Sequence, residues 1–88
     1  MTEKILTVKN RAGVHARPAA LITQTANKFA SEIMIRKDDM TVNAKSIMGV
    51  ITMGAVYDTQ LVLIADGSDE KQAAQTIFEL FESKFDED

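Results

Sequence analysis

His15 is the single histidine of the chain, and it lies two residues before Arg17 and three before Pro18. Proline is tolerated in the first turn of a helix, so this spacing predicts a helix that begins near Ala16. The backbone N–H groups at such a start are unpaired and carry partial positive charge. An imidazole beside them could carry a phosphoryl group, bound by the N–H groups of Ala16 and Arg17 and by the Arg17 guanidinium. An exposed histidine without chemistry is the alternative, and these residues alone do not separate the two.

Two segments of the chain carry distinctive motifs: residues 13–19, Gly-Val-His-Ala-Arg-Pro-Ala, and residues 45–50, Lys-Ser-Ile-Met-Gly-Val. The first resembles the active-centre signature of the HPr family, the histidine-containing phosphocarriers of the bacterial phosphoenolpyruvate-dependent sugar phosphotransferase system. The second resembles the regulatory-serine segment of the same family, and the separation of the two segments and the chain length also fit. Ala12 departs from the pattern, since many members carry a small polar residue there.

The resemblance implies a phosphoryl relay protein that is not itself an enzyme and needs no cofactor. His15 would accept a phosphoryl group on Nδ1 from enzyme I and pass it to a sugar-specific enzyme IIA domain, while Arg17 neutralises the phosphate. Ser46 would be a regulatory phosphoserine, written by an HPr kinase/phosphorylase and read by a transcriptional regulator. As a plain structural residue, Ser46 would only cap the helix that follows it.

Three apolar residues, Ile47, Met48 and Ile51, fall on this short helix, which is unusual for a solvated turn. They could fill the core or form a docking surface for partner proteins, and we favour docking because flexible methionine side chains adapt to several partners. Ala20 and Gln24 lie on a largely uncharged face of the first helix, and we expect them to complete this surface.

Other functions remain as alternatives at this stage. One is a regulatory, nitrogen-type phosphocarrier of the same family, although Pro18 and the Ser46 segment favour the sugar system. Another is a non-catalytic interaction domain in which His15 is incidental. A hydrolase or nuclease is disfavoured, because the sequence offers no second base or nucleophile–base spacing near His15.

Composition sets the limits of the interpretation. The chain has 88 residues, no cysteine and a net charge of −3, so we expect one domain (residues 1–88), no disulfide and no metal site. The acidic balance argues against nucleic-acid binding. No segment has the shape of a signal peptide or the length of a membrane span, so we expect a cytoplasmic monomer without membrane insertion. Basic residues gather near the two motifs, and acidic residues gather at the C-terminus, in Glu79, Glu82, Asp86, Glu87 and Asp88.

Hydrophobic periodicity predicts strands near residues 4–8, 31–36, 40–44 and 61–65. It predicts helices near residues 16–28, 47–52 and from 68 or 69 onward, the last opened by a capping box of Asp69 and Gln72. The fold class is therefore α+β, with the element order β-α-β-β-α-β-α. The resemblance implies an HPr-like open-faced sandwich: a four-stranded antiparallel sheet in the order 1-4-2-3 with three helices on one face. Periodicity alone also permits a ferredoxin-like order, although the apolar run at 61–65 favours a central strand.

Overall fold

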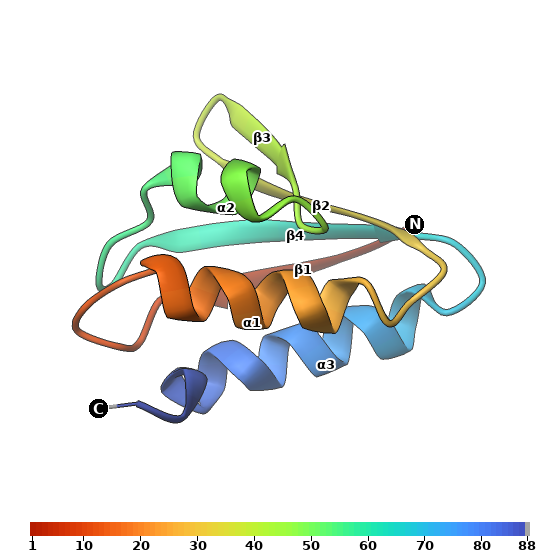
Figure 1. Ribbon diagram of the computed structural model, residues 1–88. Coiled ribbons are helices and arrows are strands. Elements are labelled where there is room, and N and C mark those ends of the chain that lie inside the picture. Colours follow the sequence, from red (N-terminus) through yellow and green to blue (C-terminus); the bar gives the residue numbers. More distant parts are fainter. Residues whose placement is uncertain (88) are drawn as a thin grey trace.

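The computed structural model describes residues 1–87 as an antiparallel sheet with three helices packed on one of its faces (Figure 1). In chain order the elements are β1 (Thr2–Thr7), α1 (Ala16–Ala26), β2 (Glu32–Lys37), β3 (Met40–Asn43), α2 (Ile47–Met53), β4 (Gln60–Asp66), α3 (Glu70–Glu82) and the short turn η1 (Lys84–Asp86). The strand order is β1-β4-β2-β3, which confirms the open-faced sandwich and makes the ferredoxin-like order wrong.

The core lies between the sheet and the helices. Alternate residues of the strands face the helices and are fully buried, as Ile33 and Leu63 show, because successive side chains of a strand point to opposite faces. The helices contribute apolar stripes, represented by Ile22 of α1 and Ile77 of α3. Burying a side chain of this size stabilises the fold by about 1.5–3 kcal/mol.

The central position of β4, predicted from its apolar run, is confirmed by its pairing with both β1 and β2. The strand is nevertheless not buried on both faces. Val62 and Ile64 lie on the uncovered face of the sheet and are only partly buried, whereas Leu61, Leu63 and Ala65 are buried. The apolar run therefore reflects the central position of β4, whose open face is partly shielded from solvent by the neighbouring strands. It does not reflect burial under a second layer of helices.

Helix ends follow the sequence in α2 and depart from it in α3. The Ser46 hydroxyl accepts a hydrogen bond from the Gly49 N–H at 3.2 Å, as expected of an N-cap. Asp69 occupies the N-cap position of α3, but its side chain makes no cap bond, so the predicted capping box is wrong. Its carboxylate instead accepts bonds from the Ser31 hydroxyl and N–H, which joins α3 to the loop before β2.

Gly13 holds the loop that precedes His15 against the segment after α2. Its φ is +76°, and a Cβ at this position would lie 2.8 Å from the Ala55 carbonyl oxygen. The next residue, Val14, donates its N–H to the same carbonyl at 2.9 Å. A glycine is therefore required here both for conformation and for space.

Gly13→Ala should lower the free energy of unfolding by about 1–3 kcal/mol, because alanine adds a backbone clash to an unfavourable φ. Gly54→Ala is the matched control: Gly54 has a φ of +64°, but an added Cβ would come no closer than 3.8 Å to the Thr52 carbonyl oxygen. Urea denaturation of both variants measures the difference. Equal losses would show that the contact with Ala55 is unimportant.

Candidate functional site

His15 is the N-cap residue of α1, with an extended backbone (φ −92°, ψ −164°) and no side-chain cap bond. Its imidazole is 45% exposed. Ala16 and Arg17 follow as the first residues of the helix, so their N–H groups lie at its positively polarised end. Pro18 is buried in the first turn, where its missing N–H costs nothing. The backbone thus presents an accessible imidazole beside an anion-binding helix end.

The C-terminal tail approaches this helix end by a left-handed turn (Figure 1). After α3, the Ser83 hydroxyl donates to the Leu80 carbonyl at 2.8 Å. Lys84, Phe85 and Asp86 then all have positive φ, between 56° and 58°. The Phe85 side chain is fully buried, and its ring centroid lies 4.8 Å from that of Phe81. This anchor directs residue 87 back toward α1.

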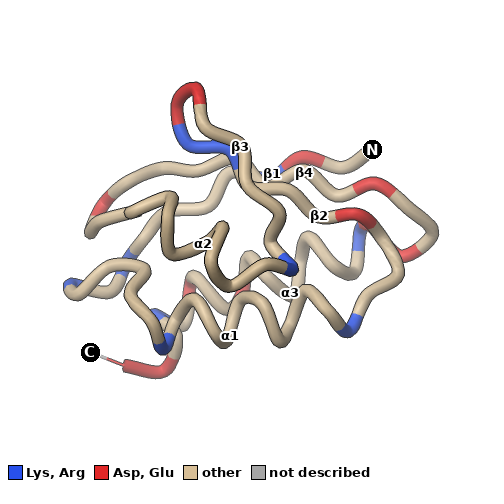
Figure 2. Tube along the Cα trace, turned by 45° about the horizontal axis from the view of Figure 1, so that its top comes forward, with Lys and Arg blue, Asp and Glu red and all other residues tan. Residues whose placement is uncertain are grey.

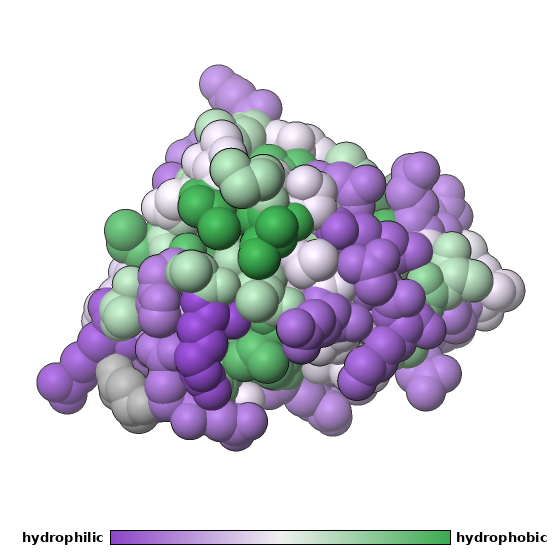
Figure 3. Space-filling view, viewed as in Figure 1, coloured by the Kyte–Doolittle hydropathy of each residue, from purple (hydrophilic) through white to green (hydrophobic). Residues whose placement is uncertain are grey.

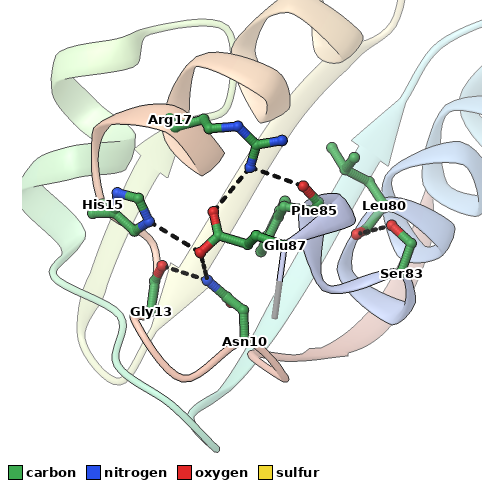
Figure 4. Close-up of polar contacts among 8 residues, drawn as sticks. All are labelled: Asn10, Gly13, His15, Arg17, Leu80, Ser83, Phe85 and Glu87. Atoms are coloured by element: carbon green, nitrogen blue, oxygen red, sulfur yellow. Dashed lines mark hydrogen bonds and ion pairs between the residues drawn. The ribbon is translucent and has the colours of Figure 1, made fainter.

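The Glu87 carboxylate lies between His15 and Arg17 (Figure 4). Its Oε2 is 3.2 Å from His15 Nε2, and its Oε1 is 2.9 Å from Arg17 Nη1. Arg17 Nη1 also donates to the Phe85 carbonyl oxygen at 2.9 Å. The second ring nitrogen of His15, Nδ1, points away from the carboxylate in Figure 4. His15 and Arg17 are therefore brought together through the Glu87 carboxylate, which the sequence showed only as one of several acidic residues near the C-terminus.

Asn10 is a second member of the site that sequence analysis missed. It is fully buried, and its Nδ2 donates to the Gly13 carbonyl at 2.8 Å and lies 3.4 Å from Glu87 Oε2. Ala12, the position that departs from the family pattern, is exposed. Asn10 therefore supplies a side-chain amide donor in this loop, whereas the methyl side chain of Ala12 has no polar group. Its place before a glycine turn was the only available signal, and it indicated a turn residue.

Hydrogen bonding from the His15 ring lowers the pKa of the Glu87 carboxyl below its ordinary value; burial opposes this effect, and Asn10 and Arg17 add to it. The direction of the pH effect on stability follows from the linkage between protonation and folding. A carboxyl with a lowered pKa in the folded state stabilises that state at neutral pH, and this contribution is lost as the pH falls below its ordinary pKa. The Glu87 contacts therefore hold the tail at neutral pH and weaken in acid.

Charge is arranged unevenly around the site. Figure 2 shows the acidic end of the chain beside basic positions at the start of α1.

Residues 1–87 hold no group of three or more histidine or acidic side chains suited to a metal ion. Within the same range, no helix is long and apolar enough to cross a membrane.

An exposed apolar patch adjoins this site on α2 (Figure 3). Ile47, Met48 and Ile51 are 40%, 67% and 37% exposed, so they do not fill the core. The buried residues of α2 are Val50 and Met53. Ala20 is half-buried and Gln24 is exposed on α1, the helix that packs beside α2. We call Ala20, Gln24, Ile47, Met48 and Ile51 the α1–α2 patch.

Ser46 lies exposed at the edge of the α1–α2 patch, with its hydroxyl at the start of α2. The neighbouring Lys45 is half-buried, and its ammonium donates to the Phe29 carbonyl at 2.8 Å. The hydroxyl of Ser46 is thus accessible while it serves as a cap.

An open-faced sandwich with an accessible histidine at the start of α1 defines the class of small phosphocarrier proteins. A family model described as "PTS HPr component phosphorylation site" matches residues 2–83. The chain belongs to the HPr family of the phosphotransferase system, which confirms the resemblance.

Individual relatives agree with this assignment. The phosphocarrier protein HPr of Treponema pallidum (strain Nichols) is 52% identical over 88 residues, which cover all of both chains. The HPr-like protein Crh of Halalkalibacterium halodurans is 44% identical over 84 residues, which cover 96% of this chain and all of that protein. The crystal structure of HPr-C-His from Thermoanaerobacter tengcongensis matches with a TM-score of 0.96 and 48% identity, and the match covers 100% and 99% of the two chains.

Proposed function

We propose that this protein carries phosphoryl groups from enzyme I to sugar-specific enzyme IIA domains on Nδ1 of His15. The observation that carries the proposal is the His15 ring at the start of α1, 45% exposed, with Nε2 bonded to Glu87 and Nδ1 directed away. A hydrogen bond to one ring nitrogen fixes which nitrogen holds the proton. With the proton on Nε2, the electron pair of Nδ1 is available to attack phosphorus.

In the transfer from enzyme I, the bond from phosphorus to the donor atom breaks and a new bond to His15 Nδ1 forms. The donor atom keeps the electron pair of the broken bond, and His15 supplies the pair for the new one. The ring gains positive charge during the attack, while its proton stays on Nε2. The N–H groups of Ala16 and Arg17 and the Arg17 guanidinium are the donors suited to the phosphoryl oxygens.

Incubation with phosphoenolpyruvate and catalytic enzyme I tests this function. We expect one acid-labile phosphoryl group per chain, located on His15 by ³¹P–¹⁵N NMR, and its subsequent transfer to an enzyme IIA domain. A folded protein that binds enzyme I but takes up no phosphoryl group would instead support the interaction domain.

The α1–α2 patch is proposed as the surface that docks enzyme I. Met48→Asp should weaken binding to enzyme I about tenfold or more, because the new charge loses its water only in the complex. Met48 is 67% exposed, so the free energy of unfolding should change by less than about 1 kcal/mol. Calorimetric titration and thermal denaturation measure the two effects.

Met40→Asp is the matched control, since Met40 is also an exposed methionine but lies on β3. It should bind enzyme I as the parent does. Equal weakening by both variants would mean that added negative charge, and not the α1–α2 patch, explains the loss.

Ser46 is proposed as a regulatory phosphorylation site, labelled by an HPr kinase/phosphorylase and recognised in that form by a transcriptional regulator. A phosphoserine at a helix start is locally favourable, because the unpaired N–H groups and the dipole stabilise negative charge. The same charge would stand at the edge of the α1–α2 patch and oppose docking of enzyme I.

Ser46→Asp should slow transfer from enzyme I on the order of tenfold at low ionic strength, with a smaller effect at high salt. Ser46→Asn is the control, because asparagine has the same shape and also caps helices but carries no charge. Rapid-quench transfer assays over a range of salt concentrations compare the two. Identical rates for both variants would rule out the electrostatic mechanism.

A further inference from the structure

We propose that Met48 is a reversible oxidation site, and that its sulfoxide form weakens the docking of enzyme I. The inference rests on the proposed function, because it concerns the regulation of the α1–α2 patch. The oxidant is hydrogen peroxide. The product is methionine sulfoxide, which methionine sulfoxide reductases return to the thioether.

Methionine holds all the sulfur of this chain, because the sequence has five methionines and no cysteine. No thiolate therefore competes with the thioethers for an oxidant. The methionines differ in accessibility: Met1, Met40 and Met48 are 76%, 42% and 67% exposed, Met34 is half-buried and Met53 is 2% exposed. A dissolved peroxide should therefore oxidise the three exposed thioethers first.

Met48 and Met53 allow a comparison within one helix. Both belong to α2, but Met53 is buried in the core together with Val50, whereas Met48 is exposed. The two residues share the same secondary structure, so the exposed fraction decides which sulfur the oxidant reaches. Met1 precedes β1 and Met40 begins β3, so Met48 is the exposed methionine that belongs to the α1–α2 patch.

The oxidation is a two-electron transfer of one oxygen atom. A sulfur electron pair of Met48 attacks one oxygen of the peroxide, the O–O bond breaks, and an S–O bond forms. The leaving hydroxide takes the proton of the transferred oxygen and departs as water. The thioether is thus oxidised, the peroxide is reduced, and the side chain keeps its length but gains a polar S=O group.

The sulfoxide weakens docking because the patch must lose its water in the complex. Ile47 and Ile51, the apolar neighbours of Met48 in the patch, have no side-chain donor for an S=O oxygen. A surface of enzyme I that fits apolar side chains leaves this oxygen unpaired, and burying an unpaired polar group costs free energy. In the free protein the S=O group is hydrated, so the fold is retained.

The experiment treats the parent, Met48→Leu and Met40→Leu with dilute hydrogen peroxide and compares each protein with its own untreated sample. Leucine keeps the apolar character of the side chain and has no sulfur to oxidise. Met40→Leu is the matched control, because it removes an exposed methionine outside the patch. Peptide mass spectrometry locates the added oxygen, and calorimetric titration measures the affinity for enzyme I.

We expect Met48 to be oxidised well before Met53. Treatment should weaken the binding of enzyme I about threefold to tenfold for the parent and for Met40→Leu. Treated Met48→Leu should bind as its untreated sample does. Methionine sulfoxide reductases for both epimers should restore the affinity of the treated parent.

Three outcomes would overturn the proposal: oxidation of Met48 no faster than that of Met53, a treated parent that binds enzyme I as tightly as its untreated sample, or equal weakening of the treated parent and treated Met48→Leu. Oxidation, binding and repair are all measured on the parent, so they decide the question even if Met48→Leu fails to fold. An untreated parent that does not bind enzyme I would overturn the proposed docking function itself, which is a different result.

Discussion

His15→Ala should accept no phosphoryl group from enzyme I and should remain folded. The side chain is the only imidazole of the chain, so no other residue can form a phosphohistidine. The imidazole is 45% exposed, and its removal should change the free energy of unfolding by less than about 1 kcal/mol. The expected loss of phosphorylation is complete, which makes this the largest effect among the variants considered.

Uptake of label from phosphoenolpyruvate, together with a thermal denaturation curve, measures both parts of this result. Ser46→Ala serves as the control, because it retains the imidazole and removes the other proposed phosphorylation site. Substantial enzyme-I-dependent labelling of His15→Ala would show that another residue is the acceptor.

Arg17→Ala should slow transfer by about two orders of magnitude, the usual effect of removing a donor that stabilises developing negative charge. Its guanidinium is 52% exposed, so the loss of its bonds to Glu87 and Phe85 should cost less than about 1 kcal/mol of stability. Arg17→Lys should recover only part of the rate, because an ammonium cannot bind two oxygens in parallel.

Single-turnover transfer from phosphorylated enzyme I gives the rates, and differential scanning calorimetry gives the stability. If Arg17→Ala transfers at the parental rate while its melting temperature drops by many degrees, Arg17 has a structural role and the hypothesis is wrong.

Local patterns in the sequence predicted the fold because the interactions they indicate, apolar burial and helix capping, are the ones that form its strands and helix ends. The apolar run at 61–65 places β4 inside the sheet, where strands on both sides pair with it. Ser46 and Gly54 mark the two ends of α2 by cap chemistry that depends only on nearby backbone groups. His15, before Pro18, sits at the start of α1 for the same local reason.

Contacts between distant residues could not be predicted in this way. Glu87 meets His15 across 72 positions of the chain, and the left-handed turn that allows it uses lysine, phenylalanine and aspartate in place of glycine. The Asp69 carboxylate accepts a hydrogen bond from Ser31 instead of capping its own helix, because the fold places the loop before β2 beside it. A periodic pattern in the sequence does not report such a contact. Such side chains belong to charged or polar stretches, in which many alternative partners fit equally well.

The turn at residues 84–86 should also make the local stability of the molecule uneven. Three successive left-handed residues cost about 1–2 kcal/mol each, and the burial of Phe85 offsets about 2 kcal/mol. The burial of Phe85 therefore offsets only part of this cost, and we expect the tail to open locally before the sheet and the three helices do. Amide hydrogens of this segment should exchange with solvent through such partial opening, far faster than those of β4. The environment of the imidazole should then vary with the opening of this turn, although the imidazole itself is attached to the start of α1.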